Sequence, residues 1–256
     1  MSWRSLLYCV CLLHLPIHAA ETFCYDTPGD STPQQPVVVA GQRIYGQHTA
    51  RIAEWILQQL PAATFVHLPW QRCLSHVRDG RISGLLSMGW TAERAQWYQF
   101  PLRDGKPDAS LALYQVPYHI FVRRDSKVQW DGQRFLGLQY GMITFKGYLT
   151  EQRLRELNAL SPLELDINQA IDLVINRRID GYVIPPGTTH HQFLQHPAFA
   201  QILQLDLPLL TMPLYLAFSP KYCQEDTERC QRIWVHLAKR QAEFTAASPQ
   251  SAVNPQ

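Results

Sequence analysis

Residues 69–101 read PWQRCLSHVRDGRISGLLSMGWTAERAQWYQFP, and this stretch decides the fold. In its first third, hydrophobic side chains recur at the i, i+3, i+4 and i+7 spacing of one helix face, at Trp70, Cys73, Leu74 and Val77. Asp79-Gly80 ends the predicted helix, because glycine readily adopts the left-handed conformation that closes a helix. Residues 82–88 are then almost continuously hydrophobic and uncharged, which predicts a strand buried on both faces.

Small and polar residues follow at the carboxyl end of that strand. Ser87, Gly89 and Thr91 precede the pair Glu93-Arg94. Threonine is a residue type that caps helices, and the first turn of a helix offers backbone N–H groups to an anion. A helix, a buried strand, a polar crevice and a cation in this order make one half of a ligand site in an open α/β fold.

A weaker copy of this unit follows 97 positions later. Residues 76–86, HVRDGRISGLL, align with residues 173–183, LVINRRIDGYV. Few positions are identical, but a helix, a charged turn, an isoleucine, a small residue and a buried strand recur in the same order. Two similar α/β units in one chain predict two lobes with a cleft between them.

The order of short motifs resembles the bacterial family 3 solute-binding proteins. These are type II periplasmic binding proteins, which deliver amino acids and related solutes to ABC importers. The motifs are P-W-x-R at 69–72, x-G-R-I-x-G at 79–84, T-x-E-R at 91–94 and F-P at 100–101, with Gly137, Gly141 and residues 178–181 matching the second lobe. The resemblance covers roughly the whole chain after residue 20. It implies an α/β fold of two lobes, each a mixed sheet flanked by helices, joined by two extended hinge crossovers.

Two extended runs are suited to be these crossovers. Ser110–Arg123 contains Pro117, and Leu210–Ser219 contains Pro213. Because proline cannot donate within a central ladder, each run is expected to change partners between the lobes. We therefore expect lobe 1 to comprise residues 21–116 and 216–246, lobe 2 to comprise residues 117–215, and residues 247–256 to form a disordered tail.

The remaining helices and strands are predicted from hydrophobic periodicity and from residues that begin or end such elements. A helix that carries Ile171, Val174 and Ile175 is expected to have Asn168 as its cap. The other expected strands cover residues 22–25, 63–68, 138–143, 181–184 and 202–205, and the other expected helices cover residues 49–60, 147–157, 190–195 and 226–244.

The first 20 residues read as a secretory signal peptide. Arg4 supplies the basic start, residues 6–15 the hydrophobic core, and His18-Ala19-Ala20 a cleavage site. A lipoprotein anchor at Cys11 is a lesser alternative. The formal charge of +2 becomes +1 without Arg4, with 22 basic against 21 acidic residues, which argues against a nucleic-acid partner. We expect a periplasmic monomer with a small-molecule ligand and either an ABC permease or a membrane sensor as its protein partner.

Four cysteines remain after the leader. An even number in an oxidising compartment favours disulfides, here Cys24 with Cys73 and Cys223 with Cys230, since the first strand should lie beside the helix of Cys73. Buried free thiols are the alternative. After residue 20 the sequence lacks any C-x-x-C or H-x3-H pair, so neither a metal nor another cofactor is expected. His190, His191 and His196 are expected on the surface of a helix.

The resemblance implies that Arg94 clamps the carboxylate of the ligand. A planar guanidinium donates two parallel hydrogen bonds to a carboxylate, which an ammonium cannot do. The alternative is a surface arginine paired with Glu93 or Asp104. The other residues expected at the ligand are Ser87, Trp90, Thr91, Tyr25, Trp70, Thr144, Phe145 and Lys146. Trp70 suits the core of a lobe as well as a cleft wall, and Trp90 could cover a lobe edge instead.

Two departures from the family pattern bear on the ligand. Amino-acid binders of the family carry G-M-T-x-T before the clamp, whereas residues 87–91 read SMGWT, one residue shorter. The family also places an aspartate for the ligand's ammonium at the position that falls at Pro185, which has neither charge nor N–H. An unpaired buried ammonium costs several kcal/mol. We therefore predict a ligand other than a standard α-amino acid.

No catalytic residue is assigned, because the chain lacks G-x-S-x-G, H-E-x-x-H and P-loop motifs. The sequence favours a solute-binding protein whose lobes close on a ligand by hinge motion, without catalysing a reaction. Three alternatives stay open: a sensory module for a membrane kinase, a dehydratase-like enzyme on the same fold, and a family member that has lost transport.

Overall fold

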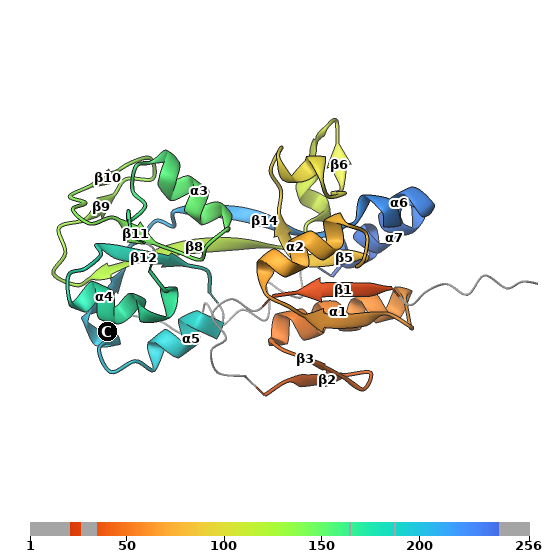
Figure 1. Ribbon diagram of the computed structural model, residues 1–256, viewed down its shortest axis with the longest axis horizontal. Helices are drawn as coiled ribbons and strands as arrows, with labels where there is room; N and C mark the ends of the chain where they lie inside the picture. The colour runs from red at the N-terminus through yellow and green to blue at the C-terminus, as the bar shows by residue number, and fades with distance from the viewer. Residues whose placement is uncertain (1–20, 27–34, 164, 187, 241–256) are drawn as a thin grey trace, which may run out of the picture.

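The computed structural model describes residues 21–26, 35–163, 165–186 and 188–240. The predicted signal peptide and the predicted tail lie outside these residues. Two groups of elements lie toward the two ends of the long axis of the molecule, and strands β8 (Tyr114–Arg123) and β14 (Leu210–Phe218) run between them (Figure 1). The predicted two-lobed α/β fold is therefore confirmed.

Lobe 1 is built around three parallel strands, with β1 in the middle. They are β1 (Thr22–Tyr25), β4 (Thr64–His67) and β5 (Gly84–Gly89). Its α-helices are α1 (Gln47–Gln59), α2 (Trp70–Arg78), α6 (Pro220–Glu225) and α7 (Thr227–Ala238). Two small hairpins and two 3-10 turns complete it: β2 (Val37–Val39) with β3 (Gln42–Ile44), β6 (Leu102–Arg103) with β7 (Lys106–Pro107), η1 (Arg94–Gln96) and η2 (Ala109–Leu111).

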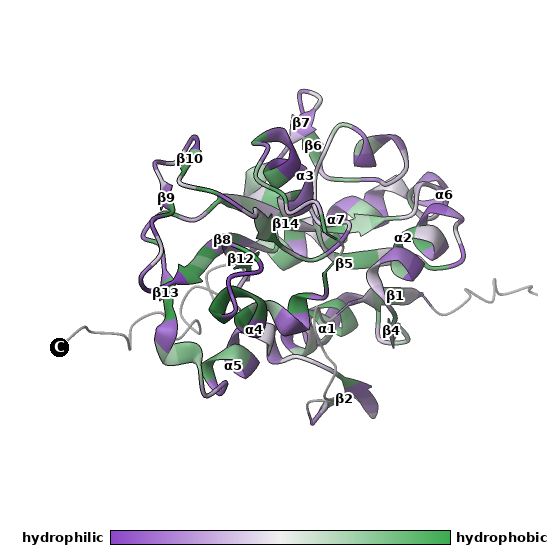
Figure 2. Ribbon diagram, turned by 60° about the vertical axis from the view of Figure 1, so that its left-hand side comes forward, coloured by the Kyte–Doolittle hydropathy of each residue, from purple (hydrophilic) through white to green (hydrophobic). Residues whose placement is uncertain are grey.

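Lobe 2 repeats a smaller version of this arrangement. Its strands are β11 (Met142–Ile143), β12 (Gly181–Ile184), β13 (Ile202–Gln204) and the hairpin of β9 (Gln129–Trp130) with β10 (Phe135–Leu136). Its helices are α3 (Leu149–Glu156), α4 (Ala170–Ile175), α5 (Thr188–Leu194), η3 (Ile167–Gln169) and η4 (Phe199–Gln201). Figure 2 shows hydrophobic residues along β5 and hydrophilic residues on the β6–β7 hairpin, as expected for a buried strand and an exposed turn.

One sheet passes through both lobes in the order β11-β12-β8-β14-β5-β1-β4, and β13 pairs with β8. The two long strands pair with each other only over residues 114–118 and 210–214. Beyond that stretch β8 pairs with β12 and β13, whereas β14 pairs with β5. Pro117 and Pro213 both lie in the shared stretch, so the two strands do change partners between the lobes as their prolines predicted.

The buried side chains form four hydrophobic clusters that respect this division. Two clusters draw their buried members only from residues up to Leu113 and from Tyr215 onward. The other two draw theirs only from Val116 to Leu214. No helix among the described residues is long and apolar enough to cross a membrane.

The helix-to-strand turn has the same hydrogen bonds in both lobes. The N–H of Arg81 donates to the carbonyl of His76 at 2.9 Å, and the N–H of Arg178, 97 positions later, donates to the carbonyl of Leu173 at 2.8 Å. The residue before each arginine has a left-handed backbone, with φ of 71° at Gly80 and 55° at Arg177. The weak sequence repeat therefore corresponds to one structural unit used twice.

Two positions after each of these arginines, a polar residue ties the strand to its parallel neighbour. Ser83 donates its N–H to the carbonyl of Thr22 at 2.8 Å, and its hydroxyl accepts the N–H of Thr22 at 3.2 Å. Asp180 donates its N–H to the carbonyl of Gly141 at 2.9 Å, and its carboxylate accepts the N–H of Gly141 at 2.8 Å. Each unit thus fixes the start of β1 or β11 through one backbone and one side-chain bond.

Glycine begins the buried strand of each unit at a point where the crossover strand lies close to it. A Cβ on Gly84 would stand 3.1 Å from the carbonyl oxygen of Ala217 on β14. A Cβ on Gly181 would overlap the carbonyl oxygen of Phe121 on β8. Both neighbours are backbone atoms, which cannot rotate away.

Both predicted disulfides are present. One joins Cys24 on β1 to Cys73 on α2, with Cα atoms 5.7 Å apart, and the other joins Cys223 on α6 to Cys230 on α7, with Cα atoms 5.8 Å apart. All four cysteines are buried. The first bridge fixes α2 on the sheet immediately before the buried strand of lobe 1.

The strand predicted at 138–143 was too long. Asp180 accepts the N–H groups of Gln139, Tyr140 and Gly141 at 2.7 to 2.8 Å, so these donors are lost to a ladder. Gly141 is also left-handed, with φ of 81°. The chain therefore enters β11 only at its last two residues.

Two helix predictions also need correction. Asp166, not Asn168, caps the segment that leads into α4, because its carboxylate accepts the N–H of Asn168 at 2.9 Å. The helix predicted from residue 226 to 244 ends at Ala238 in α7, and the preceding helix α6 was not predicted. Asp226 separates the two by accepting the N–H of Arg229 at 2.8 Å.

His190 lies inward rather than on the surface. Its ring packs 5.3 Å from that of Phe121, and its Nδ1 is buried without a hydrogen-bond partner among the described residues. His191 is exposed, as predicted, and His196 is partly exposed with its Nε2 3.5 Å from the carboxylate of Asp172. Burial, followed by the neighbouring His191 and His119, lowers the pKa of His190.

We expect Gly181→Ala to lower the free energy of unfolding by about 3 kcal/mol, because the added methyl must displace the backbone of β8. Gly41→Ala is the control: its Cβ meets nothing within 4 Å, and only its φ of 79° opposes alanine, a cost of about 1 kcal/mol. Urea unfolding at pH 7 measures both. Equal losses in the two variants would contradict the close approach.

We expect His190→Phe to make the protein less sensitive to acid. The pKa of His190 is lower in the folded than in the unfolded chain, so the unfolded chain binds the proton first as the pH falls. The wild type should therefore lose more stability than the variant as the pH falls below about 6.5, the ordinary histidine pKa. Urea midpoints from pH 8 to 5 test this. The difference between the proteins should be constant above pH 7.5, and a constant difference down to pH 5 would refute it.

Candidate functional site

The two lobes meet where the carboxyl end of β5 faces the segment that leads into α3. The approach is close: a Cβ on Gly89 would stand 2.8 Å from the side chain of Leu149, and a Cβ on Gly147 would overlap the amide of Gln71 on α2. Ligands of open α/β folds bind beyond the carboxyl ends of the strands. This junction is therefore the candidate site.

Arg94 links the two lobes at this junction. Its backbone N–H donates to the hydroxyl of Thr91 at 3.0 Å, which starts η1 as the sequence predicted. Its guanidinium donates to the carbonyl of Gly89 at 3.0 Å and, across the lobes, to that of Gly147 at 3.2 Å. The guanidinium carbon also lies 5.3 Å from the ring centre of Trp70.

No described carboxylate lies within 4.0 Å of the Arg94 guanidinium. Neither Glu93 nor Asp104, the partners of the surface alternative, forms an ion pair with it. Burial lowers the pKa of Arg94, partly opposed by nearby tyrosine hydroxyls and by Glu93. A half-buried cation held by carbonyl dipoles and an aromatic ring is electrostatically suited to an anion.

Ser87 lies at a β-bulge in β5. Met88 pairs with Tyr215 and Leu85 with Ala217, so Leu86 and Ser87 together face a single residue of β14. Ser87 itself has φ of 66°, and a bulge of this kind turns a side chain out of the regular alternation. Its hydroxyl accepts a 2.8 Å hydrogen bond from Tyr114 at the start of β8.

Tyr148 crosses from lobe 2 to the aromatic and acidic groups of lobe 1. Its ring centre lies 5.3 Å from that of Trp70, and its hydroxyl donates to the carboxylate of Asp26 at 3.3 Å. Tyr148 packs against one hydrophobic cluster from each lobe. Burial, then the charge of Asp26, holds its pKa well above the usual range for tyrosine.

Several predicted ligand residues lie at or beside this junction. Arg94, Trp70 and Thr91 are joined by the contacts above, and Phe145 packs 5.3 Å from Tyr148. Lys146 is exposed on the same segment. Trp90 follows β5 and packs against a lobe 1 cluster, with its indole nitrogen buried and unpaired among the described residues.

Two other predicted ligand residues, Tyr25 and Thr144, form hydrogen bonds within their own lobes. Tyr25 is 2% exposed, and its hydroxyl accepts the N–H of Tyr45 at 3.1 Å. The hydroxyl of Thr144 donates to the carbonyl of Val183 and hydrogen-bonds the hydroxyl of Thr150, both at 2.8 Å. These hydroxyls stabilise their own lobes.

Sequence reasoning missed two residues of lobe 2 that hydrogen-bond to lobe 1 at the junction, Gly147 and Tyr148. Both directly follow the predicted segment 144–146, and a glycine before an aromatic residue at a helix start was the only available signal. Tyr118 was also missed; burial, with the nearby Tyr114, raises its pKa, and Arg94 opposes this.

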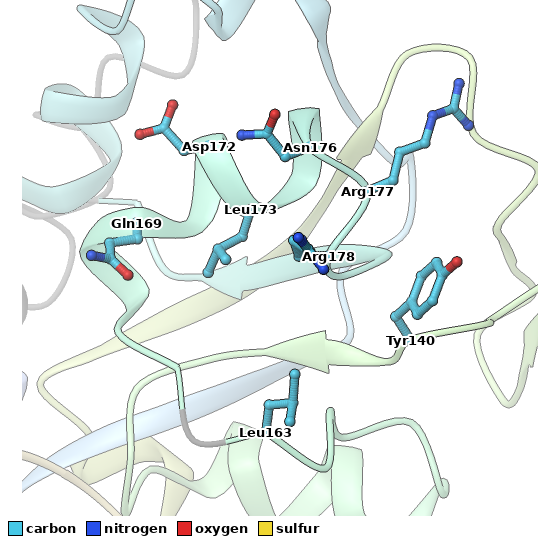
Figure 3. Close-up of a pocket in the computed structure, with 8 residues that line it drawn as sticks. All are labelled: Tyr140, Leu163, Gln169, Asp172, Leu173, Asn176, Arg177 and Arg178. Carbon is cyan, nitrogen blue, oxygen red and sulfur yellow. The ribbon is translucent and has the colours of Figure 1, made fainter.

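A hollow of about 660 Å³ lies elsewhere, on lobe 2 (Figure 3). Its lining residues are Tyr140, Leu163, Gln169, Asp172, Leu173, Asn176, Arg177 and Arg178. Tyr140 precedes β11, residues 176–178 precede β12, and Asp172 and Leu173 belong to α4. The hollow therefore opens at the amino ends of β11 and β12. It is therefore at the opposite end of the strands from Arg94 and the interlobe junction.

No family model matches the chain, and no curated protein does. Solved structures do. The substrate-binding protein of an amino acid ABC transporter is 15% identical, with a TM-score of 0.61 over 89% of this chain and 95% of that one. A second similar structure, an amino acid ABC transporter substrate-binding protein from Streptococcus pneumoniae bound to L-arginine, is 14% identical, with a TM-score of 0.62 over 88% of this chain and 90% of that one.

A third similar structure is a histidine kinase sensor domain with similarity to periplasmic binding proteins. It is 18% identical, with a TM-score of 0.62 over 93% of this chain and 99% of that one. At these identities the likeness concerns the fold. The chain has the two-lobed fold of the type II periplasmic binding proteins.

Proposed function

We propose that the chain is an extracytoplasmic solute-binding protein that captures a small carboxylate-bearing ligand between its lobes for an ABC-type importer. The single observation that carries the proposal is Arg94, a half-buried guanidinium at the lobe junction with no described carboxylate partner. Binding proteins with this fold and amino-acid ligands support the solute class. In this proposal the ligand's carboxylate accepts hydrogen bonds from the Arg94 guanidinium, which now donates to the carbonyls of Gly89 and Gly147.

The proposal includes a hinge at the paired stretch of β8 and β14. Lobe 1 would comprise residues 21–116 and 216–246, and lobe 2 residues 117–215. Apart from Val116 and Tyr215 at the two boundaries, each lobe then keeps its own two hydrophobic clusters when the angle between the lobes changes. Residues 1–20 would direct the chain to the periplasm, where the two disulfides are stable. Ligand capture would involve no catalysis, and the protein would act as a monomer.

A sensory role is the second candidate. The kinase sensor domain aligns over 99% of its own length, so the whole two-lobed unit occurs in that context too. Both roles require ligand capture and differ in the protein that reads the closed form. Co-purification with a permease supports import, and co-purification with a kinase supports sensing.

We expect Arg94→Ala to weaken binding of a carboxylate ligand by about 100-fold, because two charge-assisted hydrogen bonds are lost. Arg94→Lys should retain part of the affinity, since an ammonium keeps the charge but not the paired donors. Calorimetric titration with a panel of amino acids and other small carboxylates measures this. Arg81→Ala, an exposed arginine of the α2–β5 turn paired with Asp79, is the matched control.

Two outcomes would count against this reading. A carboxylate that binds Arg94→Ala as tightly as the wild type would remove Arg94 from the site. Tight binding of a standard α-amino acid would refute the prediction that Pro185, in place of an aspartate, excludes that class.

A further inference from the structure

The segment Gly147-Tyr148 of lobe 2 engages three different groups of lobe 1 at once. The carbonyl of Gly147 accepts from the guanidinium of Arg94 at 3.2 Å. The ring of Tyr148 lies against Trp70, with centres 5.3 Å apart and planes inclined by 33°. The Tyr148 hydroxyl donates to Asp26 at 3.3 Å. An acceptor oxygen, a planar ring and a donor therefore follow one another along the junction.

These contacts leave little space beside the segment. Gly147 has φ of 78°, and a Cβ there would overlap the side chain of Gln71 and lie 3.7 Å from Trp70. The N–H of Gly147 donates to the carboxylate of Glu151 at 2.5 Å, which fixes the backbone at the start of α3. Trp70 is itself 8% exposed. A molecule held by Arg94 against Trp70 must therefore take the place of the segment.

We propose that Gly147-Tyr148 is a built-in competitor of the ligand and that the ligand shares its pattern of groups. This inference rests on the proposed function and narrows its ligand class. The ligand is an aromatic carboxylic acid with a hydroxyl or amino group at the far end of its ring. Its carboxylate replaces the Gly147 carbonyl on Arg94, its ring replaces that of Tyr148 on Trp70, and its donor replaces the Tyr148 hydroxyl on Asp26.

The class follows from the strength of each replacement. A carboxylate binds a guanidinium more strongly than a neutral carbonyl does, so Arg94 favours the ligand over the segment. Ring stacking on Trp70 contributes in both states and nearly cancels. Displacing Tyr148 breaks its hydrogen bond to Asp26, and only a ligand with a donor restores that bond. Affinity should therefore rise from an aliphatic acid to an aromatic acid to a hydroxylated aromatic acid.

The first test asks whether Tyr148 competes with the ligand or helps to hold it. Calorimetry with 4-(4-hydroxyphenyl)butanoate should give about tenfold tighter binding to Tyr148→Ala than to the wild type, with Tyr148→Phe between them because it loses only the Asp26 bond. Tyr140→Ala, an exposed tyrosine of the lobe 2 hollow, should match the wild type. Weaker binding to Tyr148→Ala would make Tyr148 part of the ligand-holding surface and overturn the inference.

The second test addresses the ligand class. In Tyr148→Ala, 4-(4-hydroxyphenyl)butanoate should bind more tightly than 4-phenylbutanoate, which should bind more tightly than hexanoate. Asp26→Ala in the same background should remove the advantage of the hydroxyl and leave that of the ring. If all three acids bind equally and still depend on Arg94, the inference fails and the proposed function stands. If no carboxylate binds either protein, both fail.

Discussion

A carbonyl oxygen of each crossover strand lies against the position where a glycine of the neighbouring buried strand would carry its Cβ. This close approach, at Gly84 against β14 and at Gly181 against β8, fixes each α/β unit to a long strand shared by the lobes. A side chain at position 181 would push the strands apart, and one at position 84 would crowd them, so glycine allows both attachments. The same unit then sets the start of the parallel neighbour through Ser83 or Asp180. The position of the junction follows from these attachments.

The chemistry of the junction is a consequence of that geometry. Because β5 pairs with β14, its last residue Gly89 and the following Arg94 lie next to lobe 2. There the Arg94 guanidinium reaches the carbonyl of Gly147, just before α3. Removing a guanidinium from water costs several kcal/mol, and two carbonyl dipoles and one aromatic face offset only part of it. The structure thus holds a cation whose best partner, a carboxylate, is not supplied by the described residues. An anionic ligand lowers the energy of this arrangement more than any contact now present.

The sequence predicted the features that depend on neighbouring residues, and it did not predict those that depend on contacts between distant parts of the chain. The helix-and-strand repeat, the partner change at Pro117 and Pro213, and the pairing of Cys24 with Cys73 were all predictable, since spacing, proline geometry and oxidising context act locally. The shortening of β11 was not, because the carboxylate that takes its N–H groups comes from Asp180, about forty positions away.

For the site, residue type predicted Arg94 and Thr91 but not their surroundings. A serine with a positive φ, such as Ser87, is visible only once the bulge against β14 exists. Tyr25 and Thr144 were expected at the ligand because they follow or end strands, yet their hydroxyls satisfy groups inside the lobes. Tyr148 carries no local signal that it reaches the other lobe.

In the proposed function, the charged groups beside the interlobe segment determine which lobe the ligand meets first. The interlobe segment Gly147-Tyr148 contacts two charged groups of lobe 1, Arg94 and Asp26, and one of lobe 2, Glu151. Pro185, at the end of β12, gives lobe 2 neither a charge nor an N–H at the corresponding edge. Arg94 is the cation among these three groups, so in the proposed function lobe 1 supplies the long-range attraction to an anionic ligand, whereas the Gly147 carbonyl and the Tyr148 ring of lobe 2 act only in contact. In the proposed function the charge of Arg94 attracts the ligand to lobe 1 first, and the ligand then displaces Gly147 and Tyr148 from lobe 1.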